Sequence, residues 1–184
     1  MDLTLKPITR KSPDYKQFID ILVNAFPHDE LIPTWLLNLA AKRKAAKYLG
    51  IYAGDTPIAV MFTLESSEMV YLLYIAVRED LRNKGYGSEI VKLLLKHAGG
   101  RELALNSEYP GENAPDDDIR KRRLRFYDRL GIRQSGWGCT TVGVTYAVLT
   151  SHDELNAEAL YKTVASLFFG LYKVEGFPIK KVEL

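Results

Sequence analysis

Residues 69–88 decide the fold, and they read MVYLLYIAVREDLRNKGYGS. The first nine are almost all apolar, as expected of a strand buried on both faces at the centre of a sheet. The strand leads through Arg82-Asn83-Lys84-Gly85-Tyr86-Gly87-Ser88 into a segment whose apolar residues recur at helical spacing as far as Leu95. Glycines at a helix start let the backbone approach a ligand, and the free amide groups there carry partial positive charge. The stretch therefore predicts an anion cradle suited to phosphate or pyrophosphate, with added charge from Arg82 and Lys84.

Three alternatives to this cradle were considered. A dinucleotide-binding fingerprint needs a third glycine where Ile90 stands, and it normally opens a parallel sheet. An NTPase phosphate loop needs a Gly-Lys-Ser/Thr sequence, which is absent. A glycine-rich turn that merely joins strand to helix is the simplest explanation of an isolated Gly-x-Gly.

Working outward from this stretch, the sequence predicts a mixed α/β (α+β) fold. We expect an antiparallel meander, a parallel strand–helix–strand unit over residues 69–106, and an extra C-terminal helix. The expected single domain covers residues 1–184, with its core at about 3–149 and a C-terminal helix and short strand in 151–184. The predicted strands are 3–8, 48–53, 58–64, 69–77, 102–106, 132–136, 141–150 and 179–182. The predicted helices are 13–26, 34–47, a helix ending at Gly99, 116–130, and one opened by a capping box at 151–154.

The composition is that of one globular domain. The chain has 184 residues, of which 47% are hydrophobic and 26% charged, so disordered and low-complexity classes are excluded. No apolar run approaches the ~20 residues of a membrane-spanning helix, and the N-terminus lacks the pattern of a secretory signal. The single cysteine, Cys139, excludes an internal disulfide, is expected to be a buried or inert thiol, and fits the cytoplasm. No residues have metal-ligand spacing, so no metal is expected.

Two motifs give the chain a family resemblance. Arg82, Gly85 and Gly87 match the Arg/Gln-x-x-Gly-x-Gly/Ala signature of the GCN5-related N-acetyltransferase (GNAT) family. Residues 125–132, which read RFYDRLGI, resemble the family's Phe-Tyr-x-x-x-Gly-Phe segment. The resemblance extends over residues 3–149 and includes the order of the expected elements.

The resemblance implies an acyltransferase that uses acetyl-CoA as cosubstrate. The expected reaction moves an acetyl group to a primary amine of a small molecule, by direct attack in a ternary complex. The pyrophosphate of acetyl-CoA would lie on the amides of residues 82–88. The pantetheine arm would pair with the backbone of Ile75, Ala76 and Val77, whose amides would then steady the oxyanion.

Two proton transfers need catalytic groups. The resemblance assigns protonation of the leaving thiolate to Tyr127, although this side chain could instead serve only to pack with Phe126. Some relatives carry a glutamate on the central strand, but residues 71–77 hold no carboxylate. We expect Glu108 to act as the base, with three further candidates in Glu65, Glu68 and His28.

The near-neutral total charge of +2 conceals a local asymmetry. Residues 107–118 carry five acidic and no basic side chains, whereas residues 119–133 carry seven basic side chains and one acidic. The acidic segment predicts a cationic amine as acceptor. The basic run at 120–125 leaves open a nucleic-acid-binding module, and loss of catalysis would leave a CoA-binding or regulatory protein. No membrane partner is expected. A homodimer face is predicted around Leu167, Phe168 and Phe169.

Overall fold

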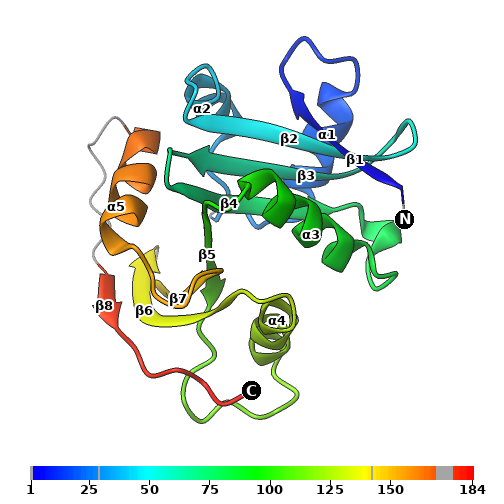
Figure 1. Ribbon diagram of the computed structural model, residues 1–184. Coiled ribbons are helices and arrows are strands. Elements are labelled where there is room, and N and C mark those ends of the chain that lie inside the picture. Colours follow the sequence, from blue (N-terminus) through cyan, green and yellow to red (C-terminus); the bar gives the residue numbers. More distant parts are fainter. Residues whose placement is uncertain (1, 29, 142, 169–175) are drawn as a thin grey trace.

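The computed structural model describes residues 2–28, 30–141, 143–168 and 176–184. Eight strands form one sheet in the order β1-β2-β3-β4-β5-β7-β6-β8 (Figure 1). The strands are β1 (Leu3–Ile8), β2 (Ala46–Ala53), β3 (Thr56–Glu65), β4 (Met69–Val77), β5 (Glu102–Glu108), β6 (Arg133–Thr141), β7 (Val144–Thr150) and β8 (Gly176–Pro178). The helices are α1 (Tyr15–Val23), α2 (Thr34–Ala40), α3 (Tyr86–Ala98), α4 (Ile119–Asp128) and α5 (Ala157–Ala165), with short 3-10 turns η1 (Glu79–Leu81) and η2 (Ser166–Phe168).

The predicted fold class and order of elements are confirmed. β4 lies at the centre of the sheet, pairs in parallel with β5, and pairs antiparallel with β3. The other neighbouring strands of the described sheet pair antiparallel. Among the helices that the structure describes, none combines the length and apolar character needed to cross a bilayer.

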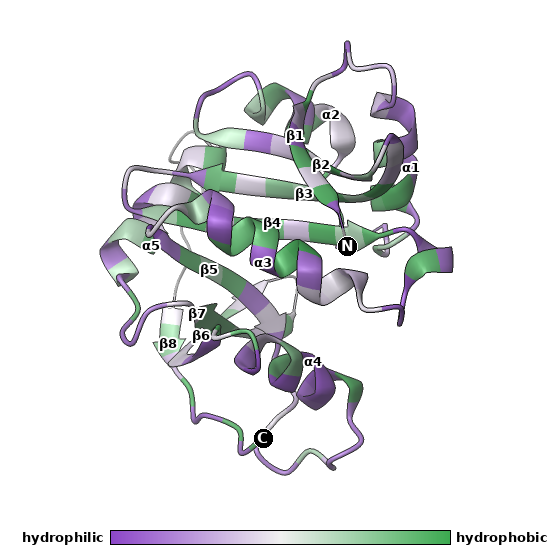
Figure 2. Cartoon of the chain, turned by 45° about the vertical axis from the view of Figure 1, so that its right-hand side comes forward, coloured by the Kyte–Doolittle hydropathy of each residue, from purple (hydrophilic) through white to green (hydrophobic). Residues whose placement is uncertain are grey.

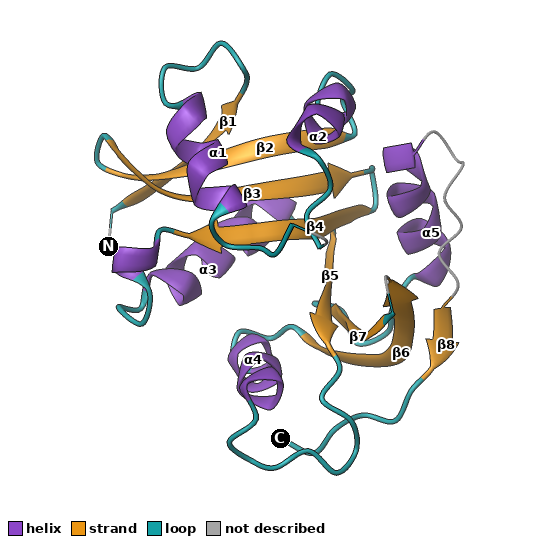
Figure 3. Cartoon of the chain, turned by 180° about the vertical axis from the view of Figure 1, so that it is seen from behind, coloured by secondary structure: helices purple, strands orange, loops and turns teal. Residues whose placement is uncertain are grey.

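Helices cover the sheet on both sides and enclose two cores. From behind, α1 and α2 lie in front of the half-sheet β1–β4 and α5 beside it, whereas α3 lies on the opposite face (Figure 3). The first core joins α1, α2 and α5 to alternate residues of the strands, with Phe18, Leu22 and Phe62 fully buried. The second joins α3 and α4 to the other face, with Leu94 and Leu124 at its centre. Each strand therefore contributes side chains to both cores, which explains the nearly continuous apolar sequence of β4.

The central pair of strands separates halfway along β4. Pairing between β4 and β5 runs only from Met69 opposite Glu102 to Leu72 opposite Leu105. A bulge then leaves Leu73 without a partner on β3. Beyond it the two strands run in clearly different directions, as Figures 1 and 3 both show. The last five residues of β4 therefore have a free edge on the side where β5 has turned away.

The second helix is shorter than predicted and uses another face. It ends at Ala40 and buries Leu37 and Ala40, whereas Trp35 is 67% exposed. The sequence pattern instead favoured a stripe of Trp35, Leu36, Leu39 and Ala40 in a helix reaching Lys47. That prediction was wrong because Lys47 belongs to β2, where its Nζ lies 2.9 Å from Glu65 Oε2.

The predicted capping box at residues 151–154 does not open the last helix. Ser151 Oγ instead accepts the backbone N–H of Leu103 at 2.9 Å, so this hydroxyl holds the sheet. The side chain of Asn156 caps α5 by accepting the N–H of Ala159. Leu167, which we expected on a dimer face, is 4% exposed and belongs to the first core, while Phe169 lies outside the described residues.

The C-terminal strands also differ from the prediction. β6 extends to Thr141, well past the predicted end at Gly136, and β8 covers residues 176–178 in place of 179–182. A Cβ at Gly138 would lie 2.7 Å from Ile179 Cγ2, so this glycine allows the chain end to pack on β6. Val182 follows the same edge, but its backbone bonds the side chain of Gln134, which is why no strand forms there.

Candidate active site

The turn between β4 and α3 has the geometry of an anion cradle. Asn83 adopts φ 60° and Gly85, the N-cap of α3, adopts φ 84°. Left-handed backbone at these positions turns the chain sharply into the helix. In the described part of the chain, no side chain caps α3, so the N–H groups of Tyr86, Gly87 and Ser88 are available to a ligand.

The charged side chains around this cradle are of two kinds. Arg78 is already engaged, because its Nε lies 2.6 Å from Asp80 Oδ1 and its Nη1 donates to the Pro57 carbonyl. Arg82 and Lys84 are exposed, and Arg82 makes only a long 3.4 Å contact from Nε to the Val77 carbonyl. Arg82 and Lys84 are therefore the cations that remain accessible to an anion at this turn.

The two sequence motifs contact each other in space. A Cβ placed on Gly87 would lie 3.5 Å from Cζ of Phe126 on α4, which is an ordinary packing distance. The Phe126 ring in turn meets the ring of Tyr127 edge to face, with centroids 5.1 Å apart. The Gly-x-Gly turn and the Phe-Tyr segment, about 40 residues apart in the sequence, thus form one continuous surface.

Tyr127 is buried in the second core, with 6% of its surface exposed. Burial raises the pKa of its phenol, against a smaller opposing effect of the Arg123 charge. Within the described residues its hydroxyl has no hydrogen-bond partner. The phenol therefore stays protonated at neutral pH and has its proton free to donate.

The open ends of β4 and β5 present backbone and one orphaned hydroxyl. Ala76 faces the first core, whereas Ile75 and Val77 are half-buried against the second. On β5, Ser107 shares the second face, is 2% exposed, and its Oγ finds no hydrogen-bond partner in the described chain. A buried unpaired hydroxyl is costly unless a ligand satisfies it. Its place beside the free edge of β4 fits an extended, amide-bearing substrate.

Glu108 ends β5 on the opposite face. Its carboxylate is 39% exposed and lies 3.7 Å from Arg120 Nη1 on α4. The rest of the acidic loop is also paired, since Asp118 binds Arg120, Asp116 binds Lys121 and Arg125, and Glu112 binds Lys180. The Arg120 guanidinium lowers the pKa of Asp118 to about 2. The negative charge of the loop is therefore largely neutralised locally, which weakens the argument for a cationic acceptor.

The other candidate bases lie elsewhere. Glu65 is held by Lys47, His97 and Arg101 beside the first residues of β4, at the end remote from the cradle. Glu68 is at the same end, where its Oε2 accepts from Asn156 Nδ2. His28 is exposed in the connection between α1 and α2. Among the carboxylates considered, Glu108 is the one at the opened end of the sheet.

Sequence reasoning missed a group of polar side chains on the face of Glu108. Tyr74 Oη donates to the Glu30 carbonyl and accepts the Ile32 N–H, both at 3.0 Å, so it fixes the connection between α1 and α2 against β4. Tyr146 stands opposite Glu108 on β7, and burial, followed by the Glu30 and Glu108 charges, raises its pKa. The alternation of buried tyrosines with apolar residues looked like simple core packing, so no signal in the sequence marked them.

Beside the end of β4 there is a hollow of about 610 Å³ between α1 and the turn to α3. Its lining residues include Asp20, Asn24, Val77, Glu79 and Arg82. It opens on the face covered by α1, opposite α3. A substrate could therefore reach the free edge of β4 from both sides of the sheet.

The basic run of α4 is partly occupied by the pairs with the acidic loop. Arg120, Lys121 and Arg125 are engaged, whereas Arg122 and Arg123 are exposed. The outer surface of α4 is strongly hydrophilic in Figure 2. Internal pairing accounts for much of the run, which removes the main reason to treat it as a nucleic-acid surface.

Comparisons with known proteins agree with this geometry. A model of the Acetyltransferase (GNAT) family matches residues 15–132. A Bacteroides thetaiotaomicron protein described as an acetyltransferase of the GNAT family is 24% identical, with TM-score 0.74, covering 92% of this chain and 99% of that one. A GNAT family acetyltransferase from Elizabethkingia anophelis, with acetyl-CoA bound, is 17% identical, with TM-score 0.58 and coverages of 80% and 96%. The ribosomal-protein-S18-alanine N-acetyltransferase from Escherichia coli is 16% identical, with TM-score 0.61 and coverages of 87% and 99%. No curated protein matches the sequence.

The family match includes the cradle at Arg82–Ser88, the free edge of β4 and the Phe126–Tyr127 segment, which are the parts that the structure brings together. The solved relatives share the whole arrangement of the sheet and its helices at low sequence identity. The chain belongs to the GNAT family of acetyltransferases.

Proposed function

We propose that the protein transfers the acetyl group of acetyl-CoA to a primary amine of a small molecule, by direct attack in a ternary complex. The observation that carries the proposal is the contact of the glycine cradle with α4, through Gly87 and Phe126, beside the free edge of β4. This arrangement combines an anion site, an extended backbone edge and a buried phenol on one path.

The residues present fit the cosubstrate. The amides of residues 82–88, with Arg82 and Lys84, would hold the pyrophosphate. The free edge at Ile75, Ala76 and Val77 would pair with the pantetheine amides as an added strand. The orphaned Ser107 Oγ supports the same path, because an amide group there would satisfy it. Acetyl-CoA supplies an activated acyl group as a thioester.

The chemistry needs one group to accept a proton and one to donate a proton. An amine of pKa ~10.4 is almost wholly protonated at neutral pH, so a base must free its lone pair. Glu108 is our candidate for this base, directly or through water. When the nitrogen–carbon bond forms and the carbon–sulfur bond breaks, the thiolate takes the phenolic proton of Tyr127. Backbone N–H groups at the end of β4 would steady the oxyanion.

A turnover assay tests the proposal. The protein is incubated with acetyl-CoA and a panel of primary amines, while free thiol is followed and the acetylated amine is detected by mass spectrometry. We expect thiol release that requires both the protein and an amine. Tight CoA binding without turnover on any amine would contradict the proposal and favour a non-catalytic CoA-binding protein.

The role of Glu108 has its own test in the pH profile. Glu108→Gln should lower kcat/KM about 100-fold at pH 7, because the amine then lacks a base. The deficit should shrink as the pH approaches the pKa of the amine, where free base is abundant. A deficit of the same size at every pH would remove Glu108 from the role of base.

A further inference from the structure

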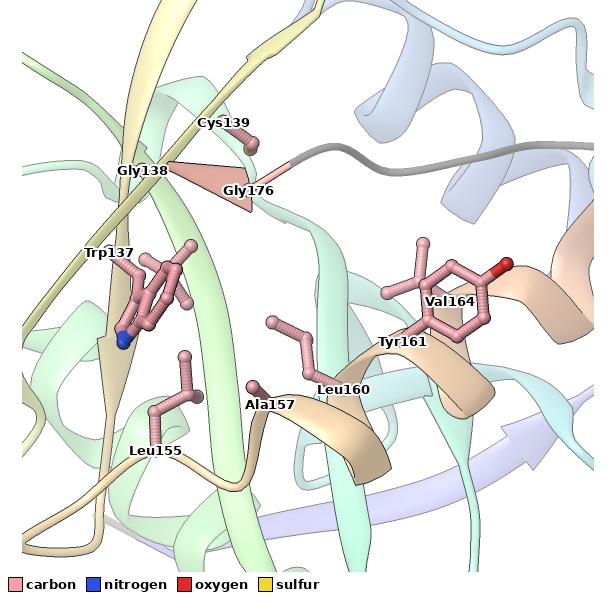
Figure 4. A pocket seen from close by; sticks show the side chains of 10 residues that line it. Trp137, Gly138, Cys139, Leu155, Ala157, Leu160, Tyr161, Val164 and Gly176 are labelled. Carbon is pink, nitrogen blue, oxygen red and sulfur yellow. The ribbon is translucent and has the colours of Figure 1, made fainter. Parts of the chain in front are cut away.

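An apolar cavity lies between α5 and the strands β6 and β7, and we call it the α5 cavity. Its volume is about 210 Å³, and Trp137, Cys139, Val148, Leu155, Leu160 and Val164 contribute to its walls. Figure 4 shows Leu155, Ala157 and Leu160 pointing into it from one side and Trp137 flanking them. None of the described residues that line it carries a charge.

The α5 cavity adjoins the opened end of the sheet. Its wall residue Cys139 lies 3.0 Å, at Sγ, from Nδ2 of Asn106. Asn106 directly follows Leu105, the last residue of β5 that pairs with β4. The side chain of Asn106 bridges the cavity wall to the point where the two strands separate.

Glu108 lies on the same face as this wall. Cys139 is opposite Tyr146, and Tyr146 is opposite Glu108, so the three form one row across β6, β7 and β5. Neighbouring strands are about 4.8 Å apart, which places Glu108 about 10 Å from Cys139. An amine bound over Tyr146 would therefore reach Glu108, with its substituent directed toward the cavity.

The size of the α5 cavity limits what this substituent can be. An apolar cavity of about 150 Å³ holds benzene, so about 210 Å³ accepts one six-membered ring or a branched aliphatic chain with a short tether. The indole of Trp137 is 42% exposed and offers an aromatic wall to a ring. The walls offer no partner for a charged or strongly polar group.

We infer that the α5 cavity binds the apolar substituent of the acceptor, so that the substrate class is a primary amine bearing one aromatic ring or a branched aliphatic chain. This inference rests on the proposed acetyl transfer to an amine. It adds a specificity pocket built by α5 and β6, outside residues 15–132 that match the family model.

The test compares ethylamine, isobutylamine and 2-phenylethylamine as acceptors. We expect kcat/KM to rise about 10- to 100-fold from ethylamine to 2-phenylethylamine, because the larger group fills the cavity. Ala157→Phe would fill the cavity from its exposed rim and abolish this preference while ethylamine is still acetylated. Lys162→Phe, on the exposed side of α5, is the matched control and should keep the preference.

A second readout does not depend on turnover. The chain has two tryptophans, so Trp35→Phe leaves Trp137 as the only indole, next to the cavity. In this background, 2-phenylethylamine should change the fluorescence saturably in the presence of CoA, and Ala157→Phe should remove the change. Trp137→Ala, which widens the cavity, should lower the preference for 2-phenylethylamine even if Ala157→Phe folds poorly.

The outcomes separate this inference from the proposed function. Turnover of all three amines with equal kcat/KM would overturn the inference and leave acetyl transfer standing. Saturable binding at Trp137 without any turnover would support the cavity as an amine site and overturn the proposed reaction. A preference for hexanoyl-CoA over acetyl-CoA that Ala157→Phe abolishes would show that the cavity takes the acyl chain, which would also overturn the inference.

Discussion

The two ends of β4 differ in what surrounds them. At its start, Met69–Leu72 are paired on both sides, and the neighbouring Glu65 carboxylate is held by three basic side chains. At its end, after the Leu73 bulge, one edge is free and faces a hydroxyl and a phenol without partners in the described chain. Satisfied groups stabilise the start, whereas unsatisfied groups at the end await a ligand. One strand thus separates the stability of this molecule from its chemistry.

The largest effect is expected at the open end. Tyr127→Phe keeps the ring and its packing but removes the proton donor, so kcat should fall about 100- to 1,000-fold. The Kd for CoA and the melting temperature should stay close to those of the parent. Steady-state kinetics and a CoA titration measure both quantities.

Tyr109→Phe is the matched control for this change. It also removes one tyrosine hydroxyl, whose partner is the Lys180 carbonyl at 3.1 Å. Its kcat should change less than twofold. Equal losses in the two variants would exclude Tyr127 from the acid role.

The next effect is expected at the paired end. Burial alone would raise the pKa of Glu65, but hydrogen bonds from Lys47, His97 and Arg101 outweigh it and lower the pKa to about 2. Glu65→Gln leaves these cations without their counter-charge and should cost about 3 kcal/mol of unfolding free energy, measured by urea denaturation. Activity per folded molecule should stay unchanged.

The pH dependence of this contribution has a defined sign. The pKa of Glu65 is lower in the folded state than its ordinary value of 4.5, so its stabilisation is fully present above that pH. It is lost as the pH falls from about 4.5 toward 2, and the Gln variant should lack this part of the curve. Glu158→Gln, at an exposed pair with Lys162, should change stability by less than about 0.5 kcal/mol at any pH. Parallel curves for the parent and Glu65→Gln would contradict the assignment.

The smallest effect is expected at the cradle, where one glycine separates binding from folding. Gly87→Ala places a Cβ at an ordinary distance from Phe126, so stability should hold or rise slightly. The added methyl group should still raise the Kd for CoA about tenfold, because it hinders close approach to the backbone. Gly85→Ala, at φ 84°, should weaken both stability and binding. An unchanged Kd in Gly87→Ala would mean that the ligand does not approach the backbone there.

The sequence was sufficient for the order of the elements and for the cradle, because periodicity, glycine turns and the apolar β4 are local signals. It failed where partners are distant. Ser151 looked like a helix cap but bonds Leu103, and Gly138 looked like a strand end but makes room for Ile179. The Leu73 bulge and the α5 cavity depend on register and on packing between elements that are far apart in sequence, so no local pattern announced them.

The central claim is that acetyl-CoA binds at the open end of β4. Hydrogen exchange of the backbone amides, with and without CoA, tests it most directly. We predict slower exchange at residues 75–77 and 82–88, with no change at residues 65 and 101–103 near the paired end. Protection confined to the basic run at residues 120–125, with unchanged exchange at 82–88, would contradict the account.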